Sequence, residues 1–211
     1  MPLYLRKETP DGLLAIWKIE EGEVLLKRIV PPFFLHDEKY SSYKNQERRK
    51  EFLSIRALIK ELIGEDFSIE YRENGAPELI SSSPYKEISI SHTKSYASVY
   101  LHKSKRVGVD IEQVAERVRK VRSYFLSKEE DLSFPEEIEL SKLTLYWSAK
   151  EALFKISSQD TLNFKEEIKI SPFPLREEGD FTANIKGESY SFSMKYLIEK
   201  DFVLVWTEKN D

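Results

Sequence analysis

Two short acidic segments, about forty residues apart, carry the residues of this 211-residue chain best suited to chemistry. The first segment alternates apolar and acidic residues in the order Gly108-Val109-Asp110-Ile111-Glu112. In a strand, the apolar side chains would pack in a core while Asp110 and Glu112 share the opposite face, roughly 7 Å apart. Paired carboxylates repel unless a divalent ion, a proton or a base neutralises them, and their oxygens suit magnesium rather than zinc. The segment therefore predicts either a magnesium site or the solvated acidic face of an edge strand.

The second segment has the pattern of a helix and reads Trp147-Ser148-Ala149-Lys150-Glu151-Ala152-Leu153-Phe154-Lys155. At 3.6 residues per turn, Trp147, Glu151 and Lys155 lie on nearly one face of this helix. That face offers an acid, a cation and an aromatic ring, which together suit a phosphate-bearing substrate. The alternative is a surface Glu-Lys pair beside a tryptophan that anchors the core.

Three further segments complete a larger pattern. In a predicted helix, Arg49 lies seven residues before Arg56. Later in the chain come the segments Ile90-Ser91-His92-Thr93 and Phe125-Leu126-Ser127-Lys128-Glu129-Glu130. Their order and spacing, from about residue 40 to 170, resemble those of the larger, surfactin-synthetase-activating type of 4′-phosphopantetheinyl transferase. Within this pattern, Ser127 and Glu130 form a capping box, which needs no role beyond starting a helix.

The resemblance implies an enzyme, a holo-[acyl-carrier-protein] synthase, with coenzyme A as co-substrate and Mg²⁺ as cofactor. Such an enzyme transfers the 4′-phosphopantetheine group from coenzyme A to a serine of an acyl or peptidyl carrier protein and releases adenosine 3′,5′-bisphosphate. The implied metal ligands are Asp110, Glu112 and Glu151, and the implied catalytic residues are Glu151 as the base, Lys155, Asp110 and His92. The implied coenzyme A contacts are Arg49, Arg72, Gly75, Pro77, Ser91, His92, Lys150 and Lys155.

One position departs from the resembled family, because this chain has Gly75-Ala76-Pro77 where the family usually has G-K-P. The missing lysine leaves the detailed coenzyme A contacts open. Arg72, five residues before Pro77, is the candidate to supply the charge.

Two alternatives use the same residues differently. One is a nucleotidyltransferase or phosphohydrolase that acts on a nucleotide, and the other is a non-catalytic module that binds coenzyme A or a carrier protein. The first lacks a Gly-rich phosphate loop, since the chain has only seven glycines and none are clustered. The second would not need all three proposed metal ligands.

Composition narrows the class of protein. The absence of cysteine excludes disulfides, zinc-thiolate sites and cysteine nucleophiles. No apolar run approaches the roughly 20 residues of a membrane span, and the amino terminus lacks a signal peptide's apolar stretch. We therefore expect a soluble, cytoplasmic monomer.

The net charge of −4 argues against a general nucleic-acid binder. A local basic run is either a docking surface for an acidic carrier protein or a solvated helix face, and it comprises Arg117, Arg119, Lys120 and Arg122.

Hydrophobic patterning predicts the elements that must position these residues. Helices are expected at about 46–63 and 140–157, and strands at 14–19, 23–30, 67–71, 87–91, 95–102, 106–112, 164–170, 181–185, 190–199 and 202–207. A weak internal repeat with an offset of 95 residues pairs 57–60 with 152–155. The resembled family has two similar α+β halves related by a pseudo-twofold, with the active site at their interface. We therefore expect an α+β fold with an N-terminal half at 1–106 and a C-terminal half at 107–211, which carries the metal and catalytic motifs.

Overall fold

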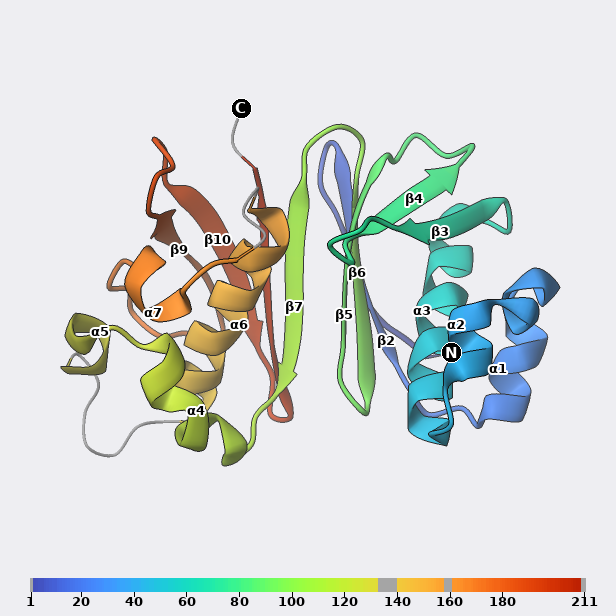
Figure 1. Ribbon diagram of the computed structural model, residues 1–211, viewed down its shortest axis with the longest axis horizontal. Coiled ribbons are helices and arrows are strands. Elements are labelled where there is room, and N and C mark those ends of the chain that lie inside the picture. Colours follow the sequence, from blue (N-terminus) through green and yellow to red (C-terminus); the bar gives the residue numbers. More distant parts are fainter. Residues whose placement is uncertain (1, 133–139, 158–160, 210–211) are drawn as a thin grey trace. The chain divides into compact units, whose positions relative to one another are not determined.

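The protein is described from a computed structural model, which describes residues 2–132, 140–157 and 161–209. The chain divides into two compact units, Met1–Ser104 and Lys105–Asp211. Each unit combines helices with an antiparallel sheet and has its own hydrophobic core (Figure 1). The expected α+β class is therefore confirmed.

The first unit is built on a four-stranded antiparallel sheet in the order β1-β2-β6-β5, with bounds Leu3–Glu8, Gly12–Lys18, Tyr96–His102 and Glu87–His92. A separate hairpin pairs β3 with β4, at Phe67–Tyr71 and Pro77–Ser81. The helices of this unit are α1, the 3-10 helix η1, α2 and α3, at Glu23–Ile29, Pro32–His36, Glu38–Ser42 and Gln46–Ile63. Helices α1, α2 and α3 lie together beside the sheet (Figure 1).

Helix α3 has the bounds that its sequence pattern predicts. The Asn45 side chain accepts a hydrogen bond from the backbone N–H of Glu47 and so caps the first turn. Gly64 ends the helix with a φ of 88°, a conformation that glycine adopts without steric cost. Between these ends, the helix buries a run from Phe52 to Ile59 in the core of the unit.

The predicted strand at 23–30 is wrong, because Glu23–Ile29 is helix α1. The buried positions Glu23, Leu26 and Val30 follow the spacing of one helix face, while Val24 and Leu25 are exposed. An ion pair between Glu23 and Lys27, one turn apart with Oε1 and Nζ separated by 3.0 Å, supports the helix.

The second unit is built on a five-stranded antiparallel sheet in the order β7-β11-β10-β9-β8, with bounds Val107–Gln113, Phe202–Glu208, Phe192–Ile198, Glu178–Ile185 and Ile168–Ile170. Its helices are α4, α5, α6 and α7, at Arg117–Phe125, Lys128–Leu132, Leu140–Ile156 and Phe164–Glu167. The long helix α6 packs across β7, β11 and β10 (Figure 1). Strand β7 and helix α6 hold the two acidic segments.

The predicted strand at 164–170 is correct only for Ile168–Ile170. The preceding residues form the short helix α7, because the Asn163 side chain accepts hydrogen bonds from the backbone N–H groups of Lys165 and Glu166. The capping box predicted at the start of α5 is confirmed, since Ser127 Oγ accepts from Glu130 N and the Glu130 carboxylate accepts from Ser127 N.

Across the three described ranges of the chain, no helix combines the length and the apolar character that crossing a membrane requires.

Candidate active site

Strand β7 places two carboxylates under helix α6. The strand lies at one edge of its sheet, where Asp110 pairs in register with Val205 of β11. Asp110 is only 4% exposed, whereas the side chain of Glu112, two residues further along the strand, is 22% exposed. The acidic face of β7 is therefore covered by a helix and is not the solvated edge that the alternative reading of the segment required.

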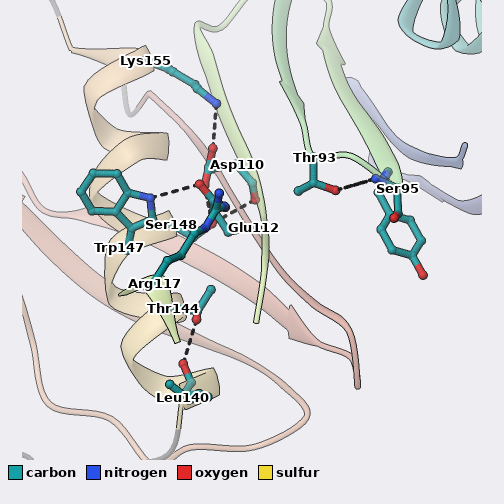
Figure 2. A network of polar contacts seen from close by, with 11 residues as sticks. Thr93, Ser95, Asp110, Glu112, Arg117, Leu140, Thr144, Trp147, Ser148 and Lys155 are labelled. Carbon is teal, nitrogen blue, oxygen red and sulfur yellow. Dashed lines mark hydrogen bonds and ion pairs between the residues drawn. The ribbon is translucent and has the colours of Figure 1, made fainter. Parts of the chain in front are cut away.

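Both carboxylate oxygens of Asp110 accept hydrogen bonds from α6. Lys155 Nζ donates to Oδ1 at 2.9 Å, and Ser148 Oγ donates to Oδ2 at 2.7 Å (Figure 2). Lys155 Nζ also donates to the backbone carbonyl of Val109 at 2.8 Å. These contacts fix the carboxylate against the helix and neutralise its charge with the lysine.

Both carboxylate oxygens of Glu112 are also occupied. Trp147 Nε1 donates to Oε1 at 3.2 Å, and the Arg117 guanidinium, from the first residue of α4, forms an ion pair with Oε2 (Figure 2). The Trp147 ring packs against the rings of Phe125 and Phe164, whose centroids are 5.3 and 5.7 Å away. Trp147 therefore positions Glu112 in addition to anchoring the helix in the core.

Glu151 on α6 is the third acid of the group. Burial raises the pKa of its carboxyl group to about 7, and the negative charges of Asp110 and then Glu112 add to the increase, while Lys155 opposes it. The charges of Asp110 and Glu112 are among the causes of this shift in the pKa of Glu151, so the three carboxylates interact electrostatically. An acid with a pKa near neutrality can both hold and release a proton under ordinary conditions.

The donor set has the right chemistry for a hard divalent cation, since it offers carboxylate oxygens whose mutual repulsion an ion would relieve. In the described parts of the chain, however, no three His, Cys, Asp or Glu side chains are already arranged as a metal-binding group. Instead, Lys155 occupies one oxygen of Asp110 and Arg117 occupies one oxygen of Glu112. An ion would therefore have to replace these basic side chains.

Gly108 fixes how closely strand β7 and helix α6 approach. A Cβ atom added at this position would lie 2.1 Å from the carbonyl oxygen of Ala152 on α6, a distance that no real Cβ contact tolerates. The two main chains thus touch at the start of the acidic segment. Glycine is required here for close approach.

Gly108→Ala is expected to lower the free energy of unfolding by about 2 kcal/mol or more, because the clash is with backbone and cannot be relieved by a side-chain rotation. Urea denaturation measures the effect. Gly22→Ala is the matched control, because an added Cβ there meets nothing within 4 Å. Equal unfolding midpoints for the two variants would show that the close approach is wrong.

Lys150 requires a correction, because the structure does not leave it available for the pyrophosphate. Its side chain is fully buried at 0% exposure, and its Nζ lies 2.7 Å from Glu130 Oε2. Nζ also donates to three backbone carbonyl oxygens, those of Phe125, Phe164 and Ile168. Lys150 therefore ties α6 to the elements around it and does not face a ligand.

The first unit holds the remaining residues that the sequence analysis singled out. His92 ends β5, and its Nδ1 lies 3.4 Å from Glu51 Oε2 of α3, while Ser91 beside it is buried. Arg49 of α3 donates from Nε to Glu23 Oε1 at 3.0 Å. These basic groups thus already have acidic neighbours within their own unit.

Arg72 lies on the β3–β4 hairpin, where Nε is 3.6 Å from Glu78 Oε2. Gly75 occupies the turn with a φ of 81°, and Pro77 begins β4. The hydrogen bonds between Arg72 N and Ala76 O and between Gly75 N and Arg72 O close this turn. Gly75 and Pro77 therefore have a clear role in shaping the hairpin.

Two residues at the site were missed as contributors from the sequence. Ser148 lies within the helical motif, one turn before Glu151, and its spacing could have indicated a contact with the acidic strand. Arg117 belongs to the basic run and was considered only as part of a docking surface. Its contact with Glu112 depends on how α4 leaves β7, which no local pattern reports.

An α+β domain with coupled carboxylates on a strand and an acid and a lysine on the covering helix is suited to group transfer from a charged substrate. Residues 106–207, which lie within the second unit, match the family model described as the 4′-phosphopantetheinyl transferase superfamily. Over these residues the second unit is therefore similar to the transferases of this superfamily. The search of curated proteins gives no significant match.

Proposed function

We propose that the protein is a 4′-phosphopantetheinyl transferase of the surfactin-synthetase-activating type, acting as a holo-[acyl-carrier-protein] synthase. It transfers the 4′-phosphopantetheine group of coenzyme A to a serine hydroxyl of an acyl or peptidyl carrier protein and releases adenosine 3′,5′-bisphosphate. The observation that carries this proposal is the coupling of Asp110 and Glu112 on β7 with Glu151 and Lys155 on α6. The superfamily match over the same residues supports it.

In this proposal Asp110, Glu112 and Glu151 would hold Mg²⁺. The ion, when bound, supplies positive charge that neutralises the pyrophosphate and eases attack by an alcohol. The carboxylates orient the site, and Ser148 and Trp147 fix two of them by hydrogen bonds. His92, Ser91, Arg49, Arg72, Gly75 and Pro77 remain the proposed coenzyme A contacts of the first unit.

Glu151 is the proposed base. The serine oxygen forms a bond to the phosphorus that bears the pantetheine arm, the bond from that phosphorus to the bridging oxygen breaks, and the serine proton passes to the Glu151 carboxylate. A pKa of about 7 lets this carboxylate accept a proton near neutral pH. Lys155 Nζ, which lies beside Asp110, stabilises the charge of the transferring phosphate.

The experiment that tests the function combines the protein with coenzyme A, Mg²⁺ and an apo carrier protein and follows the carrier by mass. A mass gain of one phosphopantetheine group supports the proposal, and it should disappear with excess chelator or with a carrier whose serine is replaced by alanine. Release of phosphate without modification of the carrier would instead support a phosphohydrolase. Binding of coenzyme A without turnover would support a non-catalytic module.

Helix α4 is the proposed docking surface for an acidic carrier. It carries the basic run together with two exposed apolar side chains, Val121 at 36% and Tyr124 at 75% exposure. The structure divides the run by role, because Arg122 forms an ion pair with Asp131 and Arg117 with Glu112. Arg119 forms an ion pair with Glu116, three residues earlier, so changing Arg119 and Lys120 leaves the ion pairs of Arg117 and Arg122 in place.

Reversing Arg119 and Lys120 to glutamate is expected to slow transfer about three- to tenfold at low salt, because complementary charge mainly raises the rate of encounter. The difference should shrink as salt is added, while coenzyme A affinity stays the same. Transfer rates measured against carrier concentration at two salt levels decide the matter. The matched control reverses Lys186 and Lys195, which are exposed elsewhere on the second unit. Equal rates for both double variants would remove α4 from the docking surface.

A further inference from the structure

Glu112 is held by two donors of very different mobility. Trp147 Nε1 contacts one carboxylate oxygen from a ring that packs against Phe125 and Phe164. Arg117 contacts the other oxygen from a side chain that is 67% exposed. The tryptophan is therefore a fixed partner, whereas the arginine can leave toward solvent.

The two basic side chains at the site also differ in how firmly they are held. Lys155 Nζ is bonded to both Asp110 Oδ1 and the carbonyl oxygen of Val109, and its side chain is 27% exposed. Among the described residues of the site, Arg117 contacts Glu112. An exposed ion pair of this kind contributes little to stability, so opening it is easy.

We infer that Arg117 is a built-in counter-ion of Glu112 that competes with a divalent cation for this carboxylate. This inference rests on the metal site of the proposed function. The guanidinium and the cation would neutralise the same charge, and in the structure the guanidinium occupies Oε2 of Glu112 while Trp147 occupies Oε1. Binding of the cation therefore requires Arg117 to move away, and the arginine sets the ion concentration at which the site fills.

The effects of Arg117 and of a bound cation on each other are reciprocal. If Arg117 weakens cation binding, then a bound cation must weaken the Arg117–Glu112 contact by the same factor. Filling the metal site would then release a positive charge at the first residue of α4, the helix that carries the basic run. Arg117 is thus a positioning residue that links the state of Glu112 to the charge presented by α4.

The test is the affinity for Mg²⁺, or for Mn²⁺ as a probe, measured by titration calorimetry in the absence of coenzyme A and carrier. Arg117→Gln should bind the ion about three- to tenfold more tightly than wild type, since a unit charge next to the site is removed. Arg117→Lys retains the charge and should stay closer to wild type. Arg176→Gln is the matched control, because it removes an exposed arginine of the same unit that makes no ion pair with the site, and its affinity should be unchanged.

The outcomes separate this inference from the proposed function. If wild type binds the ion and Arg117→Gln binds it equally or more weakly, the inference is overturned while the metal site stands. If neither protein binds the ion, the proposed metal site falls and the inference falls with it. If Arg176→Gln tightens binding as much as Arg117→Gln, the effect is one of net charge and the specific competition is overturned.

Discussion

Replacing Glu151 with glutamine is expected to slow phosphopantetheine transfer by about 100-fold or more while leaving coenzyme A affinity nearly unchanged. Glutamine keeps the shape of the side chain but cannot accept the serine proton, and general-base catalysis contributes roughly this factor. Steady-state kinetics at saturating Mg²⁺ give the two parameters. If only the Michaelis constant for coenzyme A rises, Glu151 is a binding residue and the base lies elsewhere.

The same substitution should affect the stability of the metal-free protein in a pH-dependent way. The pKa of Glu151 is about 7 in the fold, above its ordinary 4.5, so the folded state holds this proton more tightly than the unfolded state. Stability from this group is therefore present at low pH and is lost as the pH rises from about 4.5 through 7. At pH 8 Glu151→Gln should be more stable than wild type by about 1 to 3 kcal/mol, and most of this difference should be gone at pH 5.

Urea denaturation in the presence of chelator at the two pH values measures this difference. Glu116→Gln is the matched control, because Glu116 carries a side chain that is 71% exposed on the same unit. A gain that is the same at pH 5 and pH 8 would show that the carboxyl group of Glu151 is not perturbed by burial and by Asp110.

Lys150→Met should cause the largest loss of stability, about 3 to 5 kcal/mol. The change keeps the aliphatic stem but leaves the Glu130 carboxylate and three backbone carbonyls without their buried donor. Adding Glu130→Gln should restore part of the loss, since the negative charge that Lys150 neutralised is then removed. Lys195→Met, at an exposed position on β10, serves as the control. If Lys150→Met instead unfolds with a free energy within about 1 kcal/mol of wild type and binds coenzyme A more weakly, Lys150 contacts the substrate and is not a structural residue.

The two acidic segments illustrate what spacing can predict. Alternation in a strand and a four-residue period in a helix predicted that Asp110 and Glu112 share a face, as do Glu151 and Lys155, and the structure brings these residues together on β7 and α6. Both patterns follow from the backbone geometry of a single strand or helix, so they do not depend on contacts between distant parts of the chain. The roles of the residues in catalysis stay predictions.

Lys150 shows where such reasoning stops. It lies in the same motif as Lys155, but its partners are Glu130, twenty residues earlier, and the carbonyls of Phe125, Phe164 and Ile168, which lie on both sides of it in the chain and 14 to 25 residues away. No short pattern records that convergence. The segment that forms α1 was misread for a related reason, because its apolar residues are too few to distinguish a short helix from a strand when only one of its faces is buried.

The contact between Gly108 and Ala152 also bears on how this domain can vary in sequence. Where two elements meet through main-chain atoms, their separation does not depend on the sizes of the surrounding side chains. Core residues elsewhere in the second unit can therefore be exchanged for others of similar volume without moving β7 relative to α6 at this point. Gly108 thus acts as a fixed reference for the spacing between the strand acids and the helix acid, and a redesign of the unit can alter much of the core so long as this glycine is kept.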